Sequence, residues 1–170
     1  MNLKKLLVII FLFYFFTLLQ NSFFTHFDAF GGALNLVFIL FFLVAFFEEE
    51  SRYLIVFLAA AAGFFLDIFS YSYIGPSIVL LIIIGLLLKS AQSSLKNRKD
   101  SHPFIYFLPL FIVFLLAYDL LMDLYFHFLG LDKIAITTGV KIIFSLICNS
   151  LVASVLFYFY KKISLFYKKK

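Results

Sequence analysis

Residues 37–47 read VFILFFLVAFF, an apolar run without a polar interruption, and residues 79–88 read VLLIIIGLLL. A strand of a transmembrane barrel alternates apolar and polar residues over about ten positions, and neither run alternates. In lipid, every backbone N–H and C=O must bond within its own segment, so continuous apolar runs indicate transmembrane helices. The two runs therefore predict an all-α bundle in a membrane.

The composition of the whole chain agrees with a bilayer as its solvent. Of 170 residues, 65% are hydrophobic and 14% are charged, and the mean hydropathy is +1.10. Soluble domains have about 45–50% apolar and about 25% charged residues. The net charge of +5 lies in clusters beside apolar spans, where Lys and Arg set topology and contact anionic lipid. We therefore expect an integral membrane protein that does not bind nucleic acid.

The apolar stretches are long enough for six membrane spans, since about 20 apolar residues cross the hydrocarbon layer. Residues 6–19 follow Lys4 and Lys5 as a signal peptide would, but no small-residue cleavage site follows, so we expect a retained first helix. We predict a single transmembrane domain over residues 1–170, with helices at about 6–24, 32–47, 53–69, 76–88, 103–126 and 134–160.

Lysine and arginine fall on alternate connections of these six helices. They occur before the first helix, in the second and fourth connections and after the sixth helix, whereas the other connections hold only Lys133. Because cytoplasmic loops carry the excess of Lys and Arg, both termini are expected in the cytoplasm. Asp67 and Gly75 would then lie at the outer side of the membrane.

Asp67 is the acid of the stretch GFFLDIFSYSYIGP, residues 63–76. Gly63 lies on the same helix face one turn earlier, and Ala59 with Gly63 forms a pair of small residues that allows close helix packing. Gly75 followed by Pro76 is typical of a helix start. Ionisable groups within spans are functional hypotheses by default. Asp67 could cap the outer turn, contact a partner, or form a proton or ligand site.

Asp119, Asp123 and His127 recur every four residues near the outer end of the fifth helix. Two carboxylates and an imidazole can bind a divalent metal. Only His26 and Asp28 of the first outer loop could add ligands, so we predict neither a metal site nor a cofactor.

We prefer an intramembrane ion pair between Lys141 of the sixth helix and either Asp119 or Asp123, which would join the last two helices. The amides and hydroxyls further along the spans are expected to hydrogen-bond to neighbouring helices. They are Gln20, Asn21, Asn35, Ser145 and Asn149. No motif of a hydrolase, metalloprotease or nucleotide-binding enzyme occurs, so we expect no enzyme.

The arrangement Gly63-x-x-x-Asp67-x-x-Ser70-x-x-x-x-Gly75, with six apolar spans in a small chain, resembles the rod-shape-determining MreD family of bacteria. In that family a glycine closes the third span, an aspartate follows a turn later, and a glycine opens the next span. A first helix that ends in polar residues, Asn35 in the second helix and a basic loop before the fifth are also similar. The abundance of Phe and the lack of Trp depart from the family, and the last two helices offer no matching motif.

The resemblance implies a non-enzymatic, multi-pass protein of the cytoplasmic membrane that helps to maintain rod shape. Its partners would be an MreC-like membrane protein, MreB and the peptidoglycan synthases, and an oligomer of the chain is possible. Ala59, Gly63, Asp67 and Gly75 would then be partner-contact or outer-turn residues. The alternative is the substrate-binding subunit of an energy-coupling-factor transporter for a vitamin or a metal, because such bundles are similar in fold. In that case Ala59 to Gly63 would dock on the transporter, and Asp67 or the Asp119, Asp123 and His127 group would bind the ligand.

Overall fold

The computed structural model describes residues 3–22, 34–47, 52–69, 73–99, 103–129 and 139–168, with the side chains of 94–99, 139–141 and 163–168 excepted. The described residues form helices and contain no strand. The helices are α1 (Leu3–Ser22), α2 (Leu36–Phe47), α3 (Arg52–Phe69), α4 (Pro76–Lys99), α5 (Pro103–Phe128) and α6 (Gly139–Lys168).

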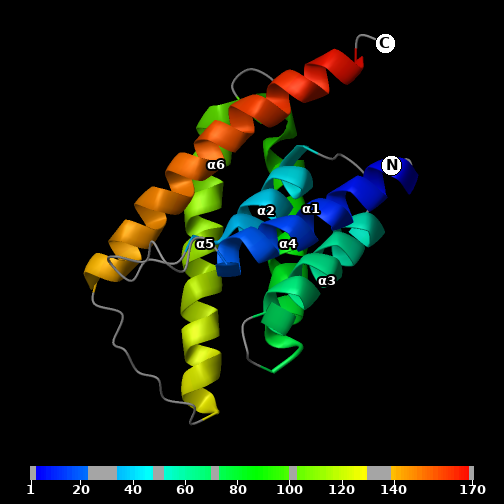
Figure 1. The fold of residues 1–170 in the computed structure, drawn as a ribbon. Coiled ribbons are helices and arrows are strands. Elements are labelled where there is room, and N and C mark those ends of the chain that lie inside the picture. Colours follow the sequence, from blue (N-terminus) through cyan, green and yellow to red (C-terminus); the bar gives the residue numbers. More distant parts are fainter. Residues whose placement is uncertain are drawn as a thin grey trace.

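Five of these helices are long and apolar enough to cross a membrane. They are α1, α3, α5 and the segments Pro76–Ser93 of α4 and Ile142–Lys162 of α6. Figure 1 shows α5 and α6 side by side at one flank of the bundle, with α1 and α3 at the other and both chain termini toward the same end. The prediction of an all-helical, multi-pass membrane protein is therefore confirmed.

The helix boundaries differ from the predicted ones at three places. The segment after Leu88 was expected to become a polar loop at Ser90, but α4 continues as a helix to Lys99. The sixth helix continues to Lys168, past its predicted end at about residue 160. The second begins at Leu36, four residues later than predicted. The predicted helical residues 23–24, 32–33 and 134–138 lie outside the described part of the chain.

The short helix α2 lies at the centre of the bundle. Every residue from Leu36 to Phe46 is buried, and α2 packs against each of the other five helices. Its 12 residues measure about 18 Å, well short of the roughly 30 Å of a hydrocarbon layer. A helix that is apolar on every side must be surrounded by protein or lipid, and here protein surrounds it.

Phenylalanine rings hold α2 against α5 and α6. The Phe42 and Phe111 ring centroids are 5.4 Å apart, and those of Phe46 and Phe107 are 5.2 Å apart, both edge to face. Phe157 of α6 completes the cluster, 4.8 Å from Phe107. Because lipid tails are as apolar as these side chains, close packing rather than exclusion of water holds helices together in a membrane. These phenylalanines therefore serve the packing of the core.

Candidate functional site

The carboxylate of Asp67 joins the end of α3 to the start of α4. Its side chain is 0% exposed, and both oxygens accept hydrogen bonds from backbone N–H groups. The Gly75 N–H donates to Oδ2 at 2.7 Å, and the Ser77 N–H donates to Oδ1 at 3.1 Å. The first N–H groups of any helix lack partners within the helix, and a negative charge there is favoured by the helix dipole. Asp67 thus has the geometry of a cap for α4.

Gly75 gives the chain the turn that this cap requires. Its φ of 134° lies in a region that side chains with a Cβ rarely adopt. Its carbonyl oxygen accepts the first hydrogen bond of α4, from the Val79 N–H at 3.0 Å. Pro76 is the first residue of α4, so the predicted Gly-Pro helix start is confirmed.

Gly63 allows α3 and α4 to touch backbone to backbone. A Cβ placed on Gly63 would lie 2.5 Å from both Cα and N of Ile78, closer than real Cβ atoms come to other atoms. Ala59, one turn earlier on the same face, is fully buried. Ala59, Gly63 and Asp67 therefore face the interior of the bundle, and their role in partner contact stays a prediction.

One side-chain hydrogen bond connects the capped end of α4 to α5. The Ser77 and Tyr118 hydroxyls lie 3.0 Å apart, and both side chains are buried. The Tyr118 ring also packs on Phe38 of α2, with centroids 5.2 Å apart. Sequence reasoning missed Ser77 and Tyr118. The sequence does show a hydroxyl at the second position of a helix, Ser77, and another within an apolar run, Tyr118. It does not show that the two form a pair.

A second polar cluster holds the buried start of α2. The Asn35 N–H donates to Asn149 Oδ1 of α6 at 2.8 Å, and the Leu36 N–H donates to Gln20 Oε1 of α1 at 3.0 Å. Asn35 Oδ1 accepts from the Phe38 N–H at 3.0 Å and so serves as the N-cap of α2. The prediction that the side chains of Gln20 and Asn149 bond to neighbouring helices is confirmed, whereas the side chain of Asn35 bonds to its own helix.

Asn21 and Ser145, the other two residues of that prediction, form hydrogen bonds within their own helices. Asn21 Nδ2 donates to the Thr17 carbonyl oxygen at 3.0 Å, and Asn149 Nδ2 donates to Ser145 Oγ at 3.2 Å. At the other end of α2, Gln92 Nε2 of α4 donates to the Phe46 carbonyl oxygen at 3.1 Å. Amide side chains from three different helices thus bond to the two ends of α2.

Asp119, Asp123 and His127, considered above as metal ligands, lie in the last third of α5. Asp119 is half-buried, and Asp123 and His127 are exposed. Among the side chains that the structure describes, no group of three or more His, Cys, Asp or Glu is arranged to hold a metal ion. The side chain of Lys141 is outside the described residues, so its pairing with Asp119 or Asp123 stays a prediction. His26 and Asp28 also lie outside them.

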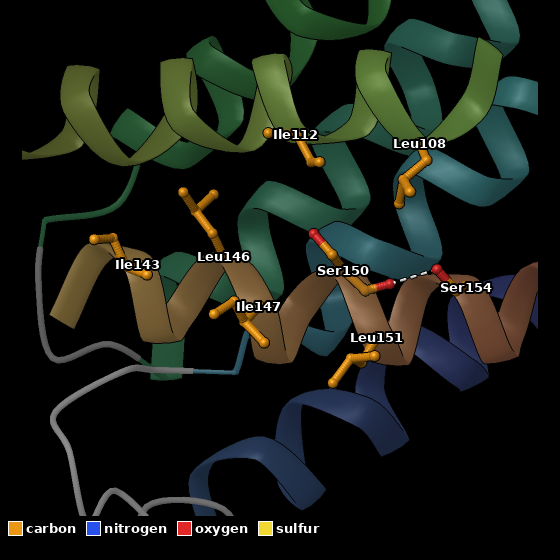
Figure 2. A pocket seen from close by; sticks show the side chains of 8 residues that line it. All are labelled: Leu108, Ile112, Ile143, Leu146, Ile147, Ser150, Leu151 and Ser154. Carbon is orange, nitrogen blue, oxygen red and sulfur yellow. Dashed lines mark hydrogen bonds between the residues drawn. The ribbon is translucent and has the colours of Figure 1, made fainter. Parts of the chain in front are cut away.

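An apolar groove of about 420 Å³ runs between α5 and α6. Figure 2 shows Leu108 and Ile112 of α5 opposite Leu146 and Ser150 of α6. The hydroxyl of Ser154 donates to the Ser150 carbonyl oxygen at 2.7 Å. A groove lined by aliphatic side chains and serine offers packing surface, and it offers neither an acid nor a base for chemistry.

The described helices define the class of this protein, a multi-pass α-helical membrane protein. Comparisons with protein-family models, with curated proteins and with solved structures give no match. The site residues therefore have to be interpreted from their own geometry.

Proposed function

We propose that this chain is a non-enzymatic scaffold of the bacterial cell-elongation machinery, similar in role to MreD. It would hold an MreC-like protein, and through it MreB and the peptidoglycan synthases, at the cytoplasmic membrane. Six spans with both termini in the cytoplasm are part of the proposal and rest on the distribution of Lys and Arg.

The junction of α3 and α4 is the observation that supports this proposal best. Three of the four residues on which the resemblance to the family rests have one shared structural task, and the fourth, Ser70, lies outside the described residues. Gly63 admits the α4 backbone, Asp67 caps α4, and Gly75 makes the turn. Because the carboxylate of this motif accepts hydrogen bonds from backbone N–H groups, the motif fixes how the two helices meet. Such a fixed junction suits a rigid scaffold.

The transporter alternative has less support from the same residues. Its docking face would be Ala59 to Gly63, but Ala59 and Gly63 are buried inside the chain. Its ligand site at Asp67 would compete with two backbone hydrogen bonds. No observation favours this alternative specifically.

Deletion of the gene in its own host tests the proposal. We expect rod-shaped cells to become round and to regain their shape when the wild-type chain is restored. Purification of a tagged chain in mild detergent, followed by mass spectrometry, should recover wall-synthesis proteins and an MreC-like partner. Recovery of transporter ATPases without wall-synthesis proteins would overturn the proposal.

Asp67→Asn separates architecture from partner contact in the same cells, with Ser93→Ala of the exposed part of α4 as a control. Normal membrane levels with lost partner recovery would assign Asp67 a part in the interface. Loss of the protein itself would assign it to the fold alone.

A further inference from the structure

The groove between α5 and α6 follows the helix axes on the outside of the bundle. On α6 its lining extends from Ile143 to Ser154, eleven positions that rise about 16 Å. Ile143 and Ile147 are exposed beside it. A length of about 16 Å is half of the roughly 30 Å hydrocarbon layer, which is the depth of one leaflet. The groove therefore has the length of an acyl chain of one leaflet.

Small side chains keep the groove open beyond a ring contact between α5 and α6. The ring centroids of Phe104 and Tyr158 are 5.4 Å apart. One turn further along each helix, Leu108 of α5 and Ser154 of α6 line the groove (Figure 2). Ser150 and Ser154 are half-buried, and the Ser154 hydroxyl donates to its own helix. The two serines thus leave space between the helices, and the remaining lining is aliphatic.

Two lysines lie at the end of α6 beyond the ring contact. Lys161 follows Ser150 by eleven positions, about three helical turns, and so lies on the face of α6 that lines the groove. Lys162 is next to it, and both are exposed. The part of α6 that is apolar enough to cross a membrane, Ile142–Lys162, ends at these lysines. Tyr158 is 62% exposed nearby, and tyrosine is enriched at the headgroup level.

We propose that the groove binds one acyl chain of an anionic phospholipid whose phosphate is held by Lys161 and Lys162. Lys161 lies about 10 Å from Ser154 along the helix axis, which leaves the glycerol backbone between the phosphate and the groove. Basic residues beside a transmembrane helix attract anionic headgroups, and lysine stems lie along apolar surface with the ammonium group at the headgroup level. The inference goes beyond the proposed function, because it concerns a lipid ligand and not a protein partner.

The charges at the basic end favour a phospholipid over a second copy of the chain. Two copies in one membrane have the same orientation, so a symmetric dimer across the groove would bring Lys161 and Lys162 of both copies to the same depth. Like charges brought together across an interface oppose binding. An anionic headgroup at that depth meets opposite charge instead, and the aliphatic side chains of the groove pack on its acyl chain.

Native mass spectrometry of the full chain in mixed micelles tests the headgroup contact. With phosphatidylglycerol and phosphatidylcholine offered in equal amounts, we expect one phosphatidylglycerol to be retained in preference. Each lysine beside an anionic headgroup contributes about fivefold to binding, so Lys161→Gln with Lys162→Gln should reduce retention about 25-fold. Lys4→Gln with Lys5→Gln is the control, because it removes two exposed charges near the N-terminus, at the same end of the bundle, and should leave retention unchanged.

Groove-filling variants test the acyl-chain contact. Ser154→Leu should abolish preferential retention, and Ile112→Phe fills the groove from α5 if the first variant does not fold. Val155→Phe, at an exposed position of α6 outside the groove lining, is the control. Unchanged retention in the lysine or groove variants, or equal retention of both phospholipids by the wild type, would overturn the proposal. A dimer of the chain that Ser154→Leu dissociates would also overturn it, because the occupant would then be a second copy.

Discussion

Replacing Asp67 by Asn tests the capping geometry most directly. An amide has one oxygen where the carboxylate has two, so its NH₂ must face either the Gly75 N–H or the Ser77 N–H, which are donors themselves. One hydrogen bond to a charged group is lost, at about 1.5–3 kcal/mol, and one N–H is left unpaired. The favourable interaction of the charge with the α4 dipole is lost as well, at about 0.3–1 kcal/mol. We expect a total loss of about 3 kcal/mol.

Reversible unfolding in mixed detergent micelles, followed by circular dichroism, measures this loss. About 3 kcal/mol corresponds to more than a hundredfold change in the folding equilibrium. Ser93→Ala is the control, because it removes an exposed hydrogen bond to the Ser90 carbonyl oxygen and should change stability by less than about 0.5 kcal/mol. If Asp67→Asn is as stable as the control, one carboxylate oxygen is enough to cap α4, and the capping argument is wrong.

The same unfolding experiment tests three further contacts. Gly63→Ala places a methyl group into the α4 backbone and should cost about 1–3 kcal/mol or more; wild-type stability would mean that α3 and α4 separate easily. Asn149→Leu leaves the half-buried Asn35 N–H without its bond to α6 and should cost about 1 kcal/mol; a variant as stable as the wild type would contradict this. Ser77→Ala and Tyr118→Phe should be coupled by about 0.6 kcal/mol in a double-mutant cycle, and additive losses would show that their hydroxyls do not interact.

The cap of α4 shows how far a local motif carries a prediction. Gly75 and Pro76 mark the helix start by their own backbone preferences, and Asp67 is close enough in sequence to reach it. Tyr118 could not be assigned in this way. Its partner Ser77 lies on another helix, and the pairing depends on how α4 and α5 pack.

The continuation of α4 past Leu88 has a similar explanation. Lys89, Ser90 and Gln92 looked like a loop because they end the apolar run, and hydropathy reports solvent rather than backbone conformation. In the structure Gln92 bonds to the Phe46 carbonyl oxygen, and Lys89 Nζ donates to Gln92 Oε1 at 3.2 Å. The helix is continued by contacts with the end of α2, which local sequence does not reveal.

By itself, the sequence determined that this chain is a helical membrane protein, where most of its helices lie, and that Gly75 and Pro76 begin α4. These properties follow from apolar run length and from the backbone preferences of single residues. Only the tertiary structure decided that α2 is the buried centre, that side chains of α1 and α6 bond to its first residues, and that Ser77 pairs with Tyr118 of α5. The reason is that every helix in lipid is apolar. Which face packs inward therefore depends on shape and hydrogen bonding between helices, not on hydropathy.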